Sequence, residues 1–230
     1  AAGLAASFTI AGTKASARVL GANDRLRVGV CGLNGRGKNH ADEYLRMDNV
    51  ELAYVIDPDS NVRDRALESA AKKANGYTIK GVADVREALA DKNLDAISVA
   101  TPNHWHSLMV IWAAQAGKHC YVEKPASHDI YEGRVALEAW KKYGVVVQHG
   151  TQQRSDSGRA AQIAAVRSGT FGRLKISYGY CCKPRSGIGF KDPGDPPSNL
   201  NWDLWRGPAV IEQYHGNYVH YDWHWFWKTV

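Results

Sequence analysis

The residues with the clearest chemical potential form a glycine-rich turn, GLNGRG at residues 32–37, directly after an apolar run. Aligned on the pattern G-x-G-x-x-G, Gly32 is expected to make the tight turn, and Gly37 to let the following helix pack closely on the preceding strand. Asn34 stands where the second glycine usually lets the backbone approach a pyrophosphate, and Gly35 beside it adds conformational freedom. With Arg36, the start of the helix would offer N–H groups and positive dipole to the phosphates of a dinucleotide.

A carboxylate follows the next apolar run. Asp57 lies 25 residues after Gly32, near the spacing of about 20 residues at which dinucleotide-binding folds place the carboxylate that bonds to a ribose. Because a carboxylate there repels a 2′-phosphate, Asp57 favours NAD over NADP. Arg63 is close enough in sequence to keep NADP as an alternative, and Asp57 could instead be a turn residue before Pro58.

A second polar cluster, TPNHWH from Thr101 to His106, follows a further apolar run. In a doubly wound sheet the carboxyl ends of neighbouring strands open onto one ligand crevice. We therefore expect Thr101, Pro102, Asn103 and His106 to lie at this crevice. The competing interpretation makes His104 and His106 ordinary polar residues at the start of a helix.

The third cluster is Glu123-Lys124-Pro125, again at the end of an apolar run. The same argument places Glu123 and Lys124 at the crevice, with the cofactor. A lysine there could polarise a substrate hydroxyl or carbonyl, which makes Lys124 the candidate catalytic residue. The alternative for Glu123 and Lys124 is a surface ion pair.

The elements that would position these clusters alternate in type from residue 26 onward, which is typical of an α/β fold with a parallel sheet covered on both faces. Apolar runs predict strands at Leu26–Cys31, Val50–Ile56, Ala96–Ala100, His119–Glu123 and Val145–His149, with a weaker one at Tyr77–Val82. Amphipathic stretches predict helices at Lys38–Arg46, Ser60–Ala74, Val85–Ala90, His106–Ala116 and Ile130–Tyr143. This order predicts a doubly wound Rossmann domain.

The pattern changes after Gly150. A helix is predicted at Ser157–Arg167, a strand at Arg173–Cys181 and a loop over the Pro- and Gly-rich stretch Lys183–Pro197. Five of the eight tryptophans then fall between Trp202 and Trp227. These aromatic side chains could stack on sugar rings, or equally form a core or an interface.

Composition excludes several other classes of protein. The net charge is +6, from 29 basic and 23 acidic residues spread along the chain, and this favours a soluble basic protein over nucleic-acid binding. No apolar run reaches the ~18–20 residues of a membrane span. The four cysteines lack C-x-x-C spacing, which argues against zinc or a disulfide framework. His220 and His224 lie in a stretch that looks extended, so their rings would not meet on a metal.

The first 25 residues differ from the rest. They begin with a small apolar run, Ala1–Gly12, and Ala15-Ser16-Ala17 fits an A-x-A cleavage site. This pattern resembles an export signal without its charged start, and the alternative is a disordered tail. The first interpretation places the protein in the periplasm, and the second in the cytoplasm.

Four runs together resemble the Gfo/Idh/MocA oxidoreductases, which include glucose–fructose oxidoreductase and inositol dehydrogenase: GLNGRG (32–37), TPNHWH (101–106), AGKHCYVEKP (116–125) and GTQQRS (150–155). The resemblance implies a Rossmann domain over residues 26–150 and, over 151–230, the start of an α+β domain with a mainly antiparallel sheet. It also implies NAD or NADP as cofactor, a sugar, polyol or related alcohol as substrate, and a homo-oligomeric complete protein. Lys124 would lie beside nicotinamide and substrate, and the turn Thr101–His106, with Pro102, Asn103 and His106, would contact the cofactor.

The family's second catalytic group, an Asp and a His about four residues apart on a helix, is expected beyond Val230. His215, His220 and His224 precede that place and do not match it. Three functions follow as hypotheses: an oxidoreductase that moves hydride between NAD and a sugar-like alcohol, an NAD-dependent glycosidase that works by transient oxidation and elimination, and a non-catalytic dinucleotide-binding protein.

Overall fold

The computed structural model describes residues 25–74, 76–182 and 184–230, and its centre is a six-stranded parallel sheet. The strand order is β3-β2-β1-β4-β5-β6. The strands are β1 (Leu26–Cys31), β2 (Val50–Ile56), β3 (Lys80–Val82), β4 (Ala96–Val99), β5 (His119–Glu123) and β6 (Val147–Gly150). The chain therefore changes direction across the sheet between β1 and β4, as a doubly wound fold does. The predicted Rossmann fold is confirmed.

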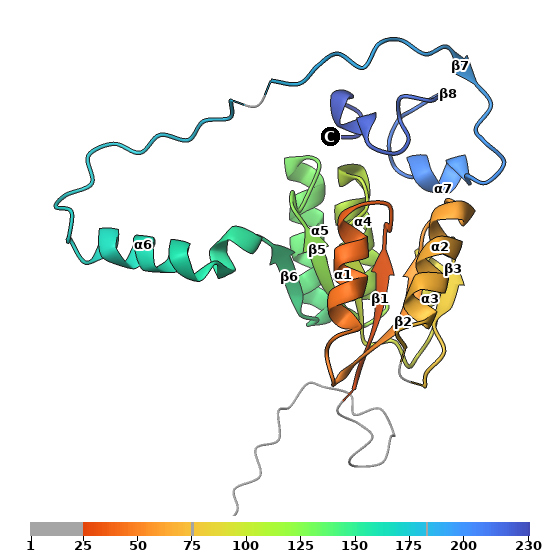
Figure 1. Cartoon of the computed structure of the whole chain (residues 1–230), viewed down its shortest axis with the longest axis horizontal. Helices are drawn as coiled ribbons and strands as arrows, with labels where there is room; N and C mark the ends of the chain where they lie inside the picture. The colour runs from red at the N-terminus through yellow and green to blue at the C-terminus, as the bar shows by residue number, and fades with distance from the viewer. Residues whose placement is uncertain (1–24, 75, 183) are drawn as a thin grey trace, which may run out of the picture.

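Helices cover both faces of this sheet (Figure 1). They are α1 (Arg36–Tyr44), α2 (Ser60–Ala71), α3 (Val85–Leu89), α4 (His106–Gln115) and α5 (Ile130–Tyr143), with a 3₁₀ turn η1 (Asn103–Trp105) before α4. Aspartate side chains cap the N-termini of α2, α3 and α5, and Gly144, at φ 65°, ends α5. Local sequence thus fixes where these helices begin and end.

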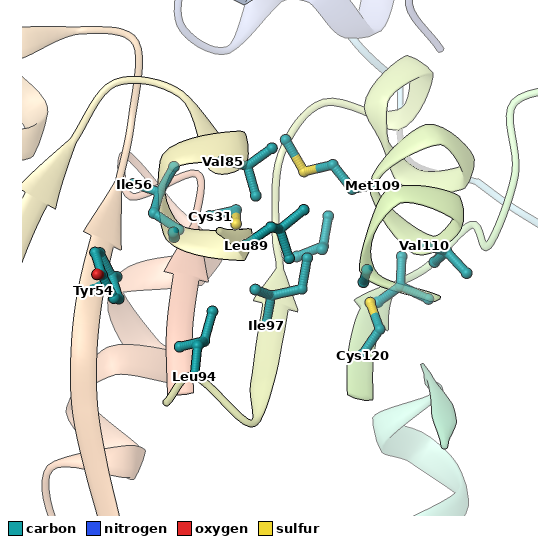
Figure 2. Packing of buried hydrophobic residues seen from close by; sticks show 14 of the residues in the cluster. Cys31, Tyr54, Ile56, Val85, Leu89, Leu94, Ile97, Met109, Val110 and Cys120 are labelled. Carbon is teal, nitrogen blue, oxygen red and sulfur yellow. The ribbon is translucent and has the colours of Figure 1, made fainter. Parts of the chain in front are cut away.

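Two apolar layers hold the helices on the sheet. On one face Val30, Leu52 and Val55 pack against Ala41 of α1 and Val62 of α2. On the other face the strands pack against α3 and α4, as Figure 2 shows. Figure 2 labels Cys31, Tyr54, Ile56, Val85, Leu89, Leu94, Ile97, Met109, Val110 and Cys120 in this layer. The strands are buried on both sides, which explains their near-continuous apolar sequences.

The chain after β6 adds elements outside the parallel sheet. It contains η2 (Gln152–Ser155), α6 (Ser157–Arg167), α7 (Trp202–Arg206), η3 (Asp222–Trp225) and an antiparallel pair, β7 (Pro193–Gly194) with β8 (Tyr214–His215). This pair agrees with the predicted start of an antiparallel sheet. In Figure 1, α6 and the segment after it extend away from the parallel sheet, while residues 200–230 lie over the carboxyl ends of its strands.

Residues 200–230, the C-terminal unit, have a small core of their own. Trp202 and Trp205 stack with ring centroids 5.2 Å apart, and Tyr218, Trp223 and Phe226 pack with them. Most of the C-terminal aromatic residues are thus core, the structural alternative named above. Tyr221 and Trp227 are exceptions, at 62% and 92% exposed.

The strand predicted at Arg173–Cys181 is wrong. These residues lie without ladder pairing, and Leu174, Ile176, Tyr178 and Tyr180 are exposed. Their alternation has the period of a strand, but a strand also needs a neighbour for its N–H and C=O groups, and the described chain places none beside it.

Other differences are shifts of element ends. The strand predicted at Tyr77–Val82 is restricted to Lys80–Val82, the part that pairs with Tyr54–Ile56 of β2. The helix predicted from Lys38 begins at Arg36, inside the glycine turn. Residues 1–24 lie outside the described residues, so the export signal stays a prediction. Among the described residues, no helix has the length and apolarity needed to cross a membrane.

Candidate functional site: a cleft at the carboxyl ends of the strands

A cleft of about 560 Å³ opens at the carboxyl ends of the parallel strands, beside the neighbouring strands β1 and β4. All the residues predicted to contact a cofactor, except Gly37, line it. They are Gly32, Asn34, Gly35, Arg36, Asp57, Thr101, Pro102, Asn103, His106, Glu123 and Lys124. Residues that are up to 92 positions apart in the chain therefore meet at one crevice, because parallel strands bring their carboxyl ends to the same edge.

The glycine turn has the geometry that its sequence predicts. Gly32 has φ +80°, and a Cβ added there would lie 2.7 Å from the carbonyl oxygen of Ala100. A Cβ on Gly37 would lie 1.8 Å from the carbonyl oxygen of Gly32, so α1 packs directly on the turn. Gly35 differs, since no described heavy atom lies within 4 Å of the Cβ that it lacks. The turn is tight beneath and open toward the cleft, as close approach of a pyrophosphate requires.

Asp57 lies in the wall of the cleft at the end of β2. Its carboxylate accepts hydrogen bonds from the backbone N–H of Leu33, at 2.8 Å, and of Asp59, at 3.0 Å. Burial raises the pKa of Asp57, and the two N–H donors oppose that rise. The carboxylate thus ties the glycine turn to β2, and each oxygen keeps a free lone pair that a ribose hydroxyl could reach.

The side-chain hydroxyl of Thr101 is a polar group that a bound ligand could engage. Its Oγ1 is buried and makes no hydrogen bond with any described residue. A buried hydroxyl without a partner is costly, and such groups are uncommon in native proteins. Together with the open face of Gly35, the orphaned hydroxyl indicates that these residues fit a bound dinucleotide.

His106 joins two loops of the site. Its Nδ1 lies 2.5 Å from the carbonyl oxygen of Pro125 and its Nε2 lies 2.9 Å from that of Thr101. The side chain is 1% exposed, and burial lowers its pKa although both carbonyls favour the charged form. His106 therefore fixes the loop of Lys124 relative to the loop of Thr101. It is not polar decoration of a helix end.

His104 has a different role from the rest of its run. Its Nε2 lies 3.2 Å from the carbonyl oxygen of Trp205, which also accepts a hydrogen bond from Trp105 Nε1 at 3.0 Å. Its Nδ1 faces the carbonyl oxygen of Thr229 at 3.5 Å. Burial lowers the pKa of His104 to about 4. Polar decoration is wrong here too, because His104 holds the C-terminal unit on the parallel sheet.

Glu123 is the polar centre of the site. Its Oε1 accepts from Arg36 Nε at 3.3 Å and from Gln152 Nε2, and lies 3.1 Å from His40 Nε2. Burial alone would raise the pKa of Glu123, but the N–H of Lys124, Arg36 and His40 together lower it. Glu123 thus ties the start of α1 to the backbone N–H of Lys124.

Lys124, in contrast, is exposed to the cleft. The surface ion pair considered for Glu123 and Lys124 is therefore wrong, since Glu123 is buried with other partners. The Glu123 carboxylate binds the backbone N–H of Lys124, and the Lys124 amine faces the cleft, where a ligand could reach it.

The C-terminal unit completes the cleft, and this was not foreseen from sequence. Its cleft-lining side chains are Leu204, Trp205, His220, Tyr221, Trp223 and His224. His224 stacks on Trp223 with centroids 3.6 Å apart, and its Nδ1 lies 2.6 Å from the carbonyl oxygen of Tyr221. The density of aromatic residues was a signal that this stretch packs on something, but it did not indicate on what.

His220 and His224 have separate partners, Asp59 and Tyr221. Within the described ranges, no group of three or more His, Cys, Asp or Glu side chains is arranged to hold a metal ion.

The sequence and the fold were compared with those of known proteins, and both match one family of oxidoreductases. The sequence model of a family described as an oxidoreductase family with an NAD-binding Rossmann fold matches residues 26–151. Myo-inositol 2-dehydrogenase of Thermotoga maritima is 32% identical over 172 residues, which are 75% of this chain and 47% of that protein. A glycosyl hydrolase family 109 protein of Shewanella baltica is 28% identical over 158 residues, 66% of this chain and 34% of that protein.

Among solved structures, the WlbA dehydrogenase of Bordetella pertussis, in complex with NADH and UDP-GlcNAcA, matches with a TM-score of 0.56 and 28% identity. The match covers 65% of this chain and 44% of that one. The chain thus spans at most about half the length of these relatives.

Proposed function

The chain belongs to the Gfo/Idh/MocA oxidoreductase family and has its NAD-binding Rossmann fold, and from this premise we propose that the complete protein transfers hydride between NAD and a sugar, polyol or related alcohol. The observation that carries the proposal is that an exposed lysine, an unpartnered buried hydroxyl and an open glycine turn share one cleft. The bound cofactor would accept or supply the hydride. The names of the relatives, an inositol dehydrogenase among them, support a polyhydroxylated substrate.

The residues of this chain would divide the work. The glycine turn and the N–H groups that begin α1 would bind the pyrophosphate, and Asp57 would bind the ribose. Lys124 would hydrogen-bond the substrate oxygen and stabilise the charge that develops there as its proton leaves or returns. Glu123 and His106 act as positioning residues, because they fix the backbone on either side of Lys124.

The test combines turnover with binding. The complete protein, incubated with NAD and a panel of sugars and polyols, should produce the absorbance of reduced nicotinamide. Lys124→Ala should lose most of that turnover and keep NAD affinity within about threefold, since the lysine would act on substrate. Lys92→Ala is the control, because Lys92 is an exposed lysine between α3 and β4, at the amino ends of the strands and away from the cleft.

Two outcomes would change the conclusion. Silence across the panel, with NAD still bound, would favour a non-catalytic dinucleotide-binding protein. Cleavage of glycosides without net production of NADH would favour the second candidate, an NAD-dependent glycosidase, which the family 109 relatives support.

We also expect the complete protein to be a homo-oligomer. The exposed apolar side chains of residues 171–180 support this expectation, because such surfaces are usually covered. Sedimentation of the complete protein would measure it.

A further inference from the structure

His220 is brought to the end of β2 from a distant part of the chain. Its Nε2 lies 2.9 Å from Asp59 Oδ2, with the His220 side chain 32% exposed and that of Asp59 4% exposed. Asp59 is two residues beyond Asp57, the carboxylate expected at the ribose. His220 therefore stands in the cleft wall at the end where the ribose is expected.

Neighbouring backbone contacts hold this arrangement in place. Ser60 N donates to the carbonyl oxygen of Asn199 at 2.8 Å, and Asn201 N donates to that of Pro58 at 3.0 Å. An antiparallel bridge joins Asp59 to Leu200 between them. The contact of His220 with Asp59 is thus part of a built interface between the C-terminal unit and the loop after β2.

The charges at this end of the cleft are nearly all engaged. Asp59 Oδ1 caps α2 by accepting from Asn61 N at 2.9 Å and from Val62 N at 3.2 Å, and its Oδ2 is occupied by His220. Arg63, which the sequence offered as a partner for a 2′-phosphate, instead pairs with Asp64 at 3.3 Å and does not line the cleft.

We propose that His220 is a specificity-determining residue for the coenzyme. Held by Asp59, its imidazole is unavailable to a 2′-phosphate, so the cleft presents carboxylates to the ribose and favours NAD. Released from Asp59, the same imidazole would hydrogen-bond the 2′-phosphate of NADP. This inference rests on the dinucleotide site of the proposed function and assigns the choice of coenzyme to a residue outside the Rossmann domain.

The decisive variant is Asp59→Asn. Asparagine caps helices as well as aspartate does, so α2 should be preserved while one negative charge is removed and the ion pair with His220 is lost. At effective dielectric constants between those of protein and water, removing one charge several ångströms from a phosphate should tighten NADP binding about tenfold. NAD affinity should change by less than about threefold.

Dissociation constants for NAD and NADP can be titrated on the 230-residue chain by quenching of tryptophan fluorescence, because Trp205 and Trp223 line the cleft. Asp129→Asn is the matched control, since Asp129 caps α5 and does not line the cleft. It should leave the NAD-to-NADP ratio unchanged.

His220→Gln and the double variant separate the imidazole from the carboxylate. His220→Gln leaves Asp59 and the cap of α2 intact, and it should weaken NADP several-fold relative to NAD because the carboxylate loses its partner. In the double variant with Asp59→Asn, the negative charge is still absent but the imidazole is gone as well, so NADP affinity should fall below that of Asp59→Asn alone.

Equal NADP affinity of Asp59→Asn and the double variant, or a coenzyme ratio unmoved in both single variants, would overturn the proposal. If the unaltered chain bound neither dinucleotide, the proposed function itself would fail. The two failures are therefore distinguishable.

Discussion

Replacing Gly37 with alanine should test the packing of the glycine turn most directly. The added Cβ would lie 1.8 Å from the carbonyl oxygen of Gly32 and 2.9 Å from its carbonyl carbon. Both are backbone atoms, so no side-chain rotation can relieve the overlap. To reach an ordinary van der Waals contact, which begins at 3.4 Å, α1 must move off the turn by more than an ångström. Overpacking of this kind costs about 1–3 kcal/mol or more.

Gly35→Ala is the matched change two residues away. Its methyl group would meet no described atom within 4 Å, and its φ of −165° is extended backbone that alanine adopts. The free energy of unfolding should therefore fall by less than about 0.5 kcal/mol, as for an ordinary surface substitution. NAD affinity should nevertheless decrease, because the open face of Gly35 is where the pyrophosphate would approach.

Urea unfolding followed by tryptophan fluorescence measures the first effect, and NAD titration the second. We expect Gly37→Ala to lose both stability and NAD affinity, and Gly35→Ala to lose affinity alone. Equal stability of the two variants would refute the packing argument. Unchanged NAD affinity in Gly35→Ala would show that the pyrophosphate does not approach this face.

Three further predictions concern the polar groups of the cleft. Thr101→Val should raise the free energy of unfolding without ligand by up to about 1 kcal/mol, because it removes an unpartnered buried hydroxyl, and it should weaken NAD binding; calorimetry with and without NAD would show opposite signs, and a destabilised free protein would contradict the prediction. Burial lowers the pKa of His104 to about 4 in the folded protein, against an ordinary 6.5, so the unfolded chain binds more protons between these pH values. The free energy of unfolding should therefore fall by up to about 3 kcal/mol as pH falls from 6.5 to 4. His104→Gln, which keeps a donor for the carbonyl of Trp205, should lose this share of the pH dependence in urea titrations. Glu123→Gln should lower the free energy of unfolding by about 1–3 kcal/mol at neutral pH, since its NH₂ would face other donors; a chemical-denaturation midpoint equal to that of the unaltered chain would exclude the role given to this carboxylate.

The parallel sheet and its cleft were predictable because the signals are local. A β-branched run such as Val50–Ile56 and a capping aspartate such as Asp59 determine elements within a few residues. Parallel topology then brings the strand ends to one edge without further information. The predicted site residues follow from that single fact.

What could not be predicted depends on contacts between distant residues. The partners of His104 are backbone carbonyls at Trp205 and Thr229, and a carbonyl leaves no mark in the sequence. His220 was considered as a metal ligand because its neighbours in sequence were visible, whereas Asp59, its partner in space, lies 161 residues earlier. The strand predicted at Arg173–Cys181 was wrong because its alternation of apolar residues has the period of a strand, but no described strand lies beside it to pair with.

Trp105 shows what the joint between the two units means for modularity. Its ring packs in the core of the parallel sheet, its Nε1 donates to the carbonyl oxygen of Trp205, and a Cβ on Gly207 would lie 2.2 Å from its ring. The Rossmann domain, residues 26–150, could therefore not be transferred by recombination to another protein without further changes. A graft that ended near residue 150 would expose the Trp105 indole and the buried His104, so it would have to carry residues 199–230, or replacements for those side chains, with it.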